Sequence, residues 1–302
     1  MRDQNILSIR GVRFGYGKHP ILQGIDLTIP QGSIFGYLGK NGAGKSTTIK
    51  ILLGLLPITE GDIFFHGKNL KDAPLLLRSS VGSMIEHPCF YPFLSVEENL
   101  RYLNTLSPME RTRIAEVLSM VGLKDHAQKK AHSLSSGLKQ RLGLAMTLFH
   151  RPEMLILDEP LNALDPQGIY ELRLILQKLN KEDGVTIFLS SHILDELEKV
   201  ADLVAIIGDG KILYQGSIEE LSKKQANKVR FKVNDTSRIT QGDYLSVFPS
   251  IRVCDSQNFE CEINTETDFA KIIEKLCKDQ ISIYGIHEKR SLLEDAFIHL
   301  TE

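Results

Sequence analysis

The chain begins with segments in which apolar and polar residues alternate. Two of them, ILSIRGVRF and IDLTI, lie around turn signals at Gly15, Gly17 and Gly24. Alternation of this kind is typical of half-buried strands, so we expect an antiparallel sheet at this end of the chain. A continuous apolar stretch, GSIFGYL, then predicts a buried strand, and residues 47–53 continue as a helix. The segment between that strand and that helix is rich in glycine.

The pattern changes to helical spacing after residue 90. Ser95 to Glu98 has the residues of a capping box, and apolar residues keep helical spacing behind it, which predicts mostly helix over 95–133. Buried strands return at 154–158, 185–189 and 204–207, separated by amphipathic helices. This is the pattern of a parallel sheet in an α/β protein.

A third region begins near residue 217. A short capped helix from Ser217, strands over 228–233 and 281–286, and a helix near 269–277 predict a small α/β appendage. We therefore expect one large domain over residues 1–217, with a helical part at about 90–150, and a small accessory domain over residues 218–302.

The composition limits the class of protein. The 302 residues are 42% apolar and 25% charged, as in ordinary soluble globular proteins. A formal net charge of −2 with no long basic run argues against nucleic acid as a partner. Four cysteines without C-x-x-C spacing support neither a zinc site nor a disulfide framework and fit a reducing cytosol. We see no signal peptide and no apolar run of about 18 residues, so a membrane role is expected only through a partner subunit.

The glycine-rich run GKNGAGKST at residues 39–47 fits the phosphate-loop pattern G-x-x-x-x-G-K-[ST]. Its glycines allow positive φ angles and turn several backbone N–H groups toward phosphate oxygens. Lys45 is expected to reach the β and γ phosphates and Ser46 to ligate Mg²⁺, while the helix dipole faces the phosphates. The predicted nucleotide-binding residues of this run are Gly39, Lys40, Asn41, Gly42, Ala43, Gly44, Lys45, Ser46 and Thr47.

Two adjacent acids, Asp158 and Glu159, directly follow the apolar strand MLIL. The carboxyl ends of parallel strands are where ligands bind in open α/β sheets. Asp158 is therefore the expected partner of Mg²⁺, and Glu159 the expected general base for a water that attacks the γ-phosphate. A solvated acidic turn is the structural alternative for a lone pair of acids, but their position about 110 residues after the phosphate loop favours the functional interpretation.

Five motifs then follow one another in order: the phosphate loop, LSSGLKQR at 134–141, LILDEP, NALD and SSH. On these motifs the chain resembles the nucleotide-binding subunit of an ABC transporter, over residues 1 to about 217. The resemblance implies an α/β P-loop NTPase (ABC ATPase) with an N-terminal antiparallel β subdomain, a helical signature subdomain and a small C-terminal α/β appendage. It also implies ATP and Mg²⁺ as ligands and a head-to-tail dimer with a second copy, in which Ser135 and Gly137 hold the γ-phosphate bound to the opposite chain.

The resemblance assigns roles to further residues. Tyr16 stands where the family places an aromatic ring that stacks on adenine, with Phe14 as the fallback. Glu86 replaces the usual glutamine that touches Mg²⁺ and the attacking water and that senses the membrane subunit. Asp165 is expected to contact the opposite cassette. His192 is expected to hydrogen-bond the γ-phosphate and position the water, which makes it a catalytic residue together with Glu159 and Lys45.

The chain departs from the common motifs at three more positions. Ser136 replaces a glycine of the signature and Leu138 a glutamine, whereas the phosphate-facing Ser135 and Gly137 are kept. Lys40 replaces a common proline at a position that faces away from the phosphates. From the two signature replacements we expect slower or differently coupled hydrolysis at most, and from Lys40 almost no effect.

Glu86, the following HPCFYPFLSVEENL and the tail from Ser291 to Leu300 resemble the bacterial branch that includes bacitracin-resistance and lantibiotic-immunity ATPases. This implies ATP hydrolysis coupled to export of antimicrobial peptides, antibiotics or similar amphiphiles. An integral membrane permease would dock beside residues 86–100 and hold the chain at the cytoplasmic face of the membrane. The alternative is a soluble, non-transport ABC ATPase that acts on ribosomes or nucleic acid, although such proteins usually carry two cassettes or a coiled-coil insertion. A non-hydrolysing nucleotide sensor is a third class, against which Glu159 and His192 argue.

Overall fold

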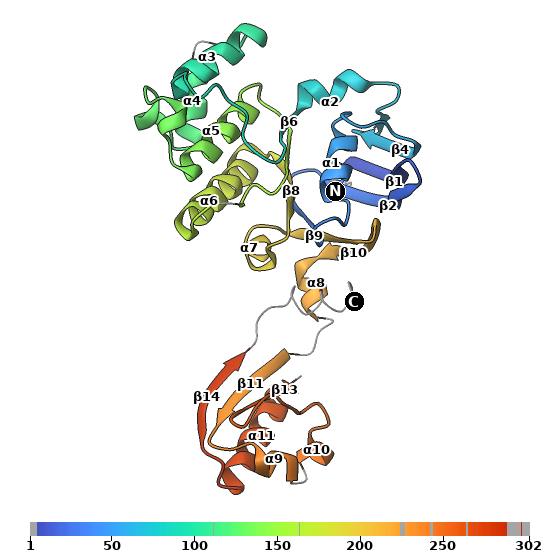
Figure 1. Cartoon of the computed structure of the whole chain (residues 1–302), viewed down its shortest axis with the longest axis vertical. Helices are drawn as coiled ribbons and strands as arrows, with labels where there is room; N and C mark the ends of the chain where they lie inside the picture. Colours follow the sequence, from blue (N-terminus) through green and yellow to red (C-terminus); the bar gives the residue numbers. More distant parts are fainter. Residues whose placement is uncertain are drawn as a thin grey trace. The chain divides into compact units, whose positions relative to one another are not determined.

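The chain folds into two compact units. The structure, a computed structural model, describes residues 5–288 and Phe297, apart from residues 111, 163, 224–226, 242–243 and 264. Proximity of Cα atoms divides the chain after Ile218, one residue beyond the end expected for the large domain (Figure 1). The tail from 291 to 300 that resembles the exporter branch lies outside the described residues, except for Phe297.

A six-stranded sheet forms the centre of the first unit. In spatial order its strands are β10 (Lys211–Ser217), β9 (Leu203–Gly208), β3 (Ile34–Leu38), β8 (Thr186–Ser191), β7 (Met154–Leu157) and β6 (Val81–Met84). Neighbouring strands are parallel except β10, which is antiparallel to β9. Strands β3, β7 and β8 are buried along their whole length, as parallel strands covered on both faces must be.

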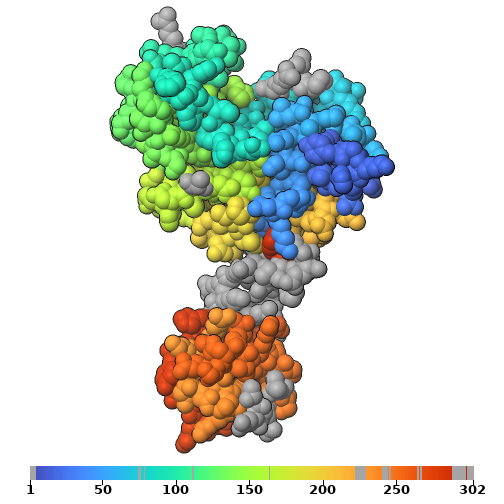
Figure 2. All heavy atoms as spheres, in the orientation of Figure 1, coloured from blue at the N-terminus to red at the C-terminus, as the bar shows by residue number. Residues whose placement is uncertain are grey.

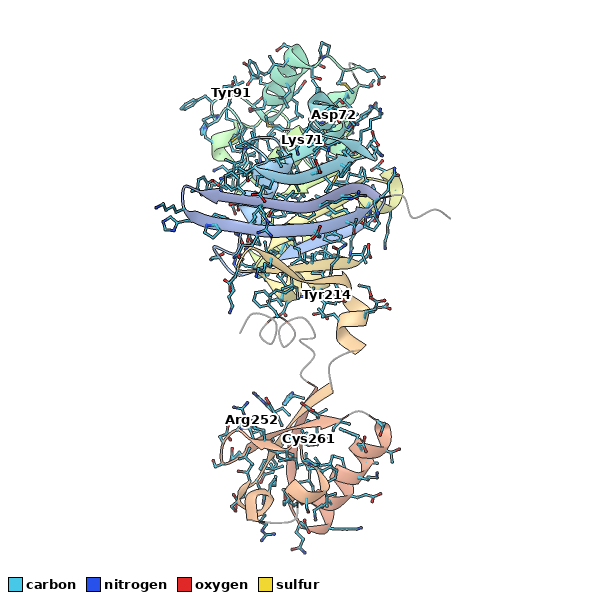
Figure 3. The ribbon with its side chains drawn as sticks, turned by 90° about the vertical axis from the view of Figure 1, so that its right-hand side faces the viewer. Lys71, Asp72, Tyr91, Tyr214, Arg252 and Cys261 are labelled. Carbon is cyan, nitrogen blue, oxygen red and sulfur yellow. The ribbon has the colours of Figure 1, made fainter. Side chains whose placement is uncertain are left out.

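A second sheet of the first unit is antiparallel, as the alternating pattern predicts. Its order is β2 (His19–Pro30), β1 (Asn5–Tyr16), β4 (Glu60–Phe65) and β5 (Lys68–Asn69). Figure 3 faces this sheet, with β1 and β2 side by side across the unit. Its apolar side chains share one core cluster with Phe35, Tyr37 and Ile49. The antiparallel sheet therefore packs against β3 of the central sheet and against the first helix.

Helices cover the central sheet. Those of the first unit are α1 (Lys45–Leu52), α2 (Pro74–Ser80), α3 (Val96–Leu106), α4 (Arg113–Met120), α5 (Ser136–Leu148), α6 (Pro166–Asp183) and α7 (Leu194–Glu198), with 3₁₀ turns at Lys124–His126 and Ala131–Ser133. Helix α8 (Ile218–Lys223) begins at the boundary between the two units. Helices α5 and α6 lie on one side of the central sheet, and α1 with the antiparallel sheet on the other (Figure 1). The space-filling view shows α3 and α4 at the surface (Figure 2). Ser95 and Glu98 form the predicted capping box at the start of α3.

The second unit is a βαββαβ unit with the strand order of the ferredoxin-like fold. Its elements are β11 (Asn227–Val233), α9 (Ser237–Gln241), α10 (Tyr244–Val247), β12 (Arg252–Val253), β13 (Asn258–Ile263), α11 (Glu266–Lys278) and β14 (Ile283–Glu288), in the sheet order β12-β13-β11-β14. All pairings are antiparallel. Phe231 and Phe259 stack in the core with ring centroids 5.0 Å apart.

The fold class agrees with the sequence, and the differences are local. Strands β6 and β10 were not expected, because β6 has four residues and β10 alternates only between exposed and half-buried side chains. Strand β13 was also not expected, although Phe259, Cys261 and Ile263 alternate with polar residues. In the described part of the chain, no helix is both long and apolar enough for a membrane span.

Candidate functional site

The phosphate-loop run connects β3 to α1 by a turn that needs glycine. Gly42 and Gly44 have φ angles of 85° and 110°, in the region that side chains with a Cβ rarely adopt. A Cβ on Gly39 would lie 2.7 Å from the carbonyl oxygen of Ile207 on β9. The loop is therefore held close to the neighbouring strand, and the N-terminus of α1 opens toward the space above it.

Lys45 is turned back into the loop. Its side chain is only 6% exposed, and its Nζ donates to the carbonyl oxygen of Gly39 at 2.7 Å. The same Nζ lies 3.2 Å from Oε1 of Glu159. Within the loop backbone, the N–H of Ala43 donates to the carbonyl oxygen of Lys40. A buried ammonium group needs such partners, and here they fix it beside the glycine-rich turn.

The first acid of the pair, Asp158, is 1% exposed at the end of β7. Its Oδ1 accepts a hydrogen bond from the Ser190 hydroxyl at 2.6 Å, and that hydroxyl in turn accepts from the backbone N–H of Glu159 at 2.9 Å. Its Oδ2 is buried and has no hydrogen-bond partner among the described residues. A buried carboxylate oxygen left in this way is costly, and a hard divalent cation is the ligand that suits it. The residues present therefore fit Mg²⁺.

The second acid, Glu159, is held between two cationic or potentially cationic groups. Its Oε2 lies 2.8 Å from Nδ1 of His192, while its Oε1 faces Lys45. Its φ angle is 50°, which is uncommon for a residue with a side chain and is often found at functional sites. With this backbone the carboxylate of Glu159 faces Lys45 of the phosphate loop.

These groups line one hollow of about 390 Å³. Its lining residues are Ile21, Asn41, Gly42, Gly44, Lys45, Ser46, Thr47, Glu159, Asn162 and His192. The fold thus joins the phosphate loop to residues more than a hundred positions later in the chain, because β3, β7 and β8 end at the same edge of the sheet. Ser190 was not predicted as a site residue, although its position at the end of β8, two residues before His192, is the signal that would have found it.

Glu86 lies outside the hollow at the phosphate loop. Its Oε1 accepts from Nζ of Lys50 at 3.0 Å, and it does not line the hollow. This hydrogen bond and the charge of Lys50 lower the pKa of Glu86 below its usual value. The expected contact between Glu86 and Mg²⁺ therefore stays a prediction, and it requires Glu86 to leave Lys50.

Tyr16 ends β1 with an exposed ring. The residue is 55% exposed, and its ring contacts that of Phe14 in an edge-on arrangement, with centroids 5.1 Å apart and planes at 88°. Phe14 is 7% exposed, so it has no free face for a base. Of the two aromatic residues considered for adenine stacking, only Tyr16 has an accessible face.

The signature residues line a second hollow, of about 320 Å³, which shares no lining residue with the first. Ser135 caps α5 by accepting from Leu138 N–H at 3.4 Å, and Asp165 caps α6 by accepting from Gly168 N–H at 3.0 Å. Gly137 lies beside Gly168, which a Cβ on Gly137 would approach to 4.0 Å. One chain therefore brings Ser135, Gly137 and Asp165 together, but it does not bring them to its own phosphate loop.

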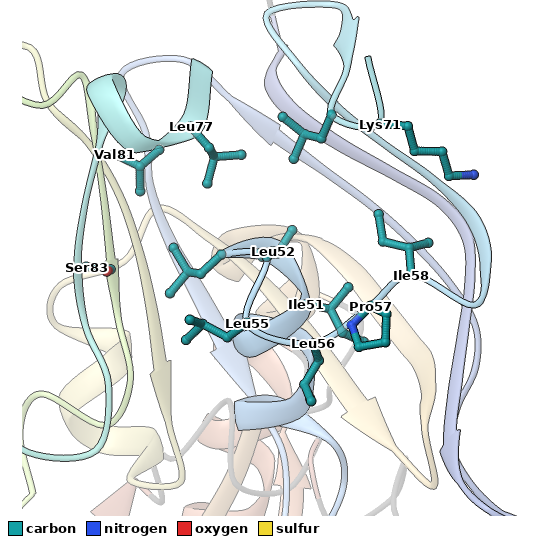
Figure 4. A pocket seen from close by; sticks show the side chains of 13 residues that line it. Ile51, Leu52, Leu55, Leu56, Pro57, Ile58, Lys71, Leu77, Val81 and Ser83 are labelled. Atoms are coloured by element: carbon teal, nitrogen blue, oxygen red, sulfur yellow. The ribbon is translucent and has the colours of Figure 1, made fainter. Parts of the chain in front are cut away.

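A third hollow, of about 520 Å³, lies at the other end of α1 (Figure 4). Its labelled side chains are mostly apolar, among them Leu52, Leu55, Leu56 and Leu77, with Lys71 at the rim. Its lining residues include none of the residues predicted for nucleotide or metal binding.

The fold and the first hollow define a P-loop ATPase. Residues 22–162 match the ABC transporter family. The chain is 38% identical over 294 residues to the bacitracin transport ATP-binding protein BcrA of Enterococcus faecalis, covering 94% of this chain and 92% of that protein. It is 42% identical over 226 residues to the lantibiotic transport ATP-binding protein SrtF of Streptococcus pyogenes, covering 73% of this chain and 97% of that protein.

Among solved structures, CbiO1 of Clostridium perfringens, part of the ABC transporter complex CbiONQ, superimposes with a TM-score of 0.68 at 30% identity, covering 72% of this chain and 90% of CbiO1. The chain belongs to the ABC transporter family. It is an ATP-binding subunit that hydrolyses ATP to power transport, as the five motifs predict.

Proposed function

We propose that this chain powers the export of an antimicrobial peptide, or of a similar amphiphile, through a separate membrane permease. ATP hydrolysis is supported by the arrangement of Lys45, Glu159 and His192. The carboxylate of Glu159 lies 3.2 Å from the lysine and 2.8 Å from the histidine. The names of the bacitracin and lantibiotic relatives support the substrate class.

In the proposed mechanism, Lys45 and the backbone N–H groups of the loop bind the β and γ phosphates. Ser46 and Oδ2 of Asp158 would hold Mg²⁺, which when bound neutralises charge on the phosphate oxygens. Ser190 keeps Asp158 oriented, since its hydroxyl occupies the other carboxylate oxygen. The sheet edge thus supplies both positive charge and a fixed carboxylate to the polyphosphate.

Glu159 accepts the proton of the attacking water. Once phosphate oxygens become the partner of Lys45, the Oε1 of Glu159 is free to act as a base. His192 stays in hydrogen-bond contact with Oε2 and fixes the carboxylate in place. This division of roles makes His192 a positioning group as well as a donor to the γ-phosphate.

The separation of the two hollows supports a head-to-tail dimer. A second copy would bring its Ser135 and Gly137 to the phosphate loop of the first, so that each ATP is enclosed by two chains. Asp165, which shares the signature hollow, would lie at this interface.

An exposed aromatic loop supports docking of the permease beside residues 86–100. Tyr91 and Phe93 are exposed, yet the buried Asn99 fixes the loop by accepting from Tyr91 N–H at 2.7 Å and donating to Ser95 O at 2.9 Å. Rigid aromatic side chains on a surface are typical anchors for a partner. Figure 3 labels Tyr91 at the outer surface of the first unit.

A ribosome or nucleic-acid ATPase fits less well. Such proteins usually carry a coiled-coil insertion before the signature, whereas the longest helix described between the phosphate loop and Ser135 is α3, with 11 residues.

The proposal is tested by purifying the membrane protein that associates with the Glu159→Gln chain in the presence of ATP and Mg²⁺. Proteoliposomes containing that membrane protein and the unaltered chain should remove a lantibiotic or bacitracin from the bilayer in an ATP-dependent way. Transport of an unrelated solute without peptide removal would reject the substrate class. Association with ribosomes instead of a membrane protein would reject the transport role.

A further inference from the structure

Glu86 and Lys50 form an ion pair beside the nucleotide site. The Nζ of Lys50 and the Oε1 of Glu86 are 3.0 Å apart, and the two side chains are 36% and 62% exposed. Lys50 follows Ser46 by four residues in α1, so the two side chains lie on the same face of the helix, about 5–6 Å apart at Cβ. Lys50, the partner of Glu86, thus lies one helical turn from the hydroxyl expected to ligate Mg²⁺.

The backbone turns sharply at Glu86. His87 N–H donates to Ile85 O at 2.7 Å, which closes a γ-turn around Glu86, and Glu86 has a φ of 58°. A γ-turn with positive φ at a residue other than glycine is rare and strained. Strain of this kind clusters at ligand sites and switch segments.

The charge of Lys50 also interacts with that of Asp158. Its pKa is raised above the usual lysine value, first by the hydrogen bond and charge of Glu86 and also by the charge of Asp158. An exposed ion pair contributes little to stability, so Glu86 can exchange this lysine for another cation at small cost.

We propose that Lys50 is a positioning residue that neutralises Glu86 while the phosphates enter and releases it toward Mg²⁺ when the metal is held by Ser46 and Asp158. A glutamine at position 86 would need no such partner. The lysine therefore compensates for the extra negative charge that Glu86 brings to a site for a polyanion. This inference depends on ATP binding and does not depend on the transported substrate.

The test measures the Kd of a fluorescent, non-hydrolysable ATP analogue, first with EDTA and then with Mg²⁺. In EDTA, Lys50→Met should raise the Kd about fivefold, because Glu86 then repels the phosphates. In the Glu86→Gln background the same substitution should change the Kd less than about twofold, and Lys50→Arg should keep the original Kd. With Mg²⁺, the effect of Lys50→Met should shrink, since Glu86 has the metal as its partner.

Lys71→Met is the matched control. Lys71 forms an ion pair of the same length, 3.0 Å, with Asp62 in the same unit but away from the phosphate loop. It should leave both Kd values unchanged. An equal rise in Kd for Lys50→Met with Glu86 and with Gln at position 86 would show that Lys50 acts on the phosphates directly. No rise in either background would also overturn the proposal.

Discussion

The two units differ in which polar and charged side chains they bury. In the first unit, Lys45, Asp158 and Ser190 are buried at one edge of a parallel sheet. Among the described residues of the second unit, no charged side chain is buried, and the hydroxyl of the buried Thr236 donates to Asp255 O at 2.7 Å. Burying polar and charged groups costs stability, so they are kept where they have hydrogen-bond partners, as Asn99 does, or where chemistry requires them. The comparison assigns catalysis to the first unit and packing to the described core of the second.

The outer face of the second unit reinforces this contrast. Arg230 on β11 donates to Glu260 on the adjacent β13 at 2.9 Å, and the buried Phe231 and Phe259 point to the opposite face. Charges are thus paired on the surface and phenyl rings are packed inside. This is the ordinary pattern of an antiparallel sheet with one face covered.

The largest expected difference between the units comes from removing the proposed base. Glu159→Gln should lower the ATPase rate about 10²–10⁴-fold, because the amide cannot accept the proton of the attacking water. Phosphate release by the purified chain measures this rate. The control, Glu262→Gln on the exposed face of β13, should leave it unchanged. An equal loss of ATPase activity in both variants would contradict the assignment of ATP hydrolysis to the first unit.

Phe231→Ala should affect the other unit. Loss of this buried ring should destabilise the second unit by about 3–5 kcal/mol, since it stacks on Phe259 and leaves a cavity when removed. Urea unfolding followed by circular dichroism should show one of two transitions moved to lower urea, with ATPase activity retained below it. A parallel loss of ATPase activity at low urea would show that the cassette depends on the accessory unit.

Ser190→Ala should have an intermediate effect. It removes a donor to Asp158 and an acceptor for the Glu159 N–H, and each buried group left without a partner costs about 1–3 kcal/mol. We expect a lower melting temperature together with a higher Mg²⁺ requirement for ATPase activity. Ser191→Ala is the matched control, because Ser191 is also buried and, among the described residues, its hydroxyl bonds within its own turn to Ile193. Equal Mg²⁺ requirements in the two variants would contradict the role of Ser190.

The smallest effect should come from the exposed tyrosines. Tyr16→Ala should raise the Kd for ATP about tenfold, within the range of about 1–3 kcal/mol for stacking one base on an aromatic ring. Tyr284→Ala removes a ring of similar exposure, 64% against 55%, from the second unit and should not change the Kd. Equilibrium titration with a fluorescent ATP analogue distinguishes the two. An unchanged Kd for Tyr16→Ala would remove it from the adenine site.

The sequence predicted the cassette well because its motifs are local. The phosphate loop depends on glycines and a lysine at fixed spacing, and the acids depend on one apolar strand, so each could be recognised without a three-dimensional arrangement. Ser190 was missed because its role arises only when β7 and β8 lie side by side. The partner of Glu86 was missed for a related reason, since Lys50 precedes it by 36 residues.

The second unit was harder to predict. Its sheet places β11 between β13 and β14, and this order depends on contacts between distant segments that carry no motif. The alternation in β13 was visible, but Cys261 stands in its centre, where a larger apolar residue would have given a stronger signal.

Because β3 lies inside the central sheet, we expect it to unfold later than the strands at the edges of that sheet. This strand has five fully buried residues and is hydrogen-bonded on both sides, to β9 and to β8. Its amide hydrogens should therefore exchange with solvent among the slowest of the chain, and those of the edge strand β10 much faster. The phosphate loop is attached directly to β3, so fraying at the edges of the sheet would leave its anchor in place.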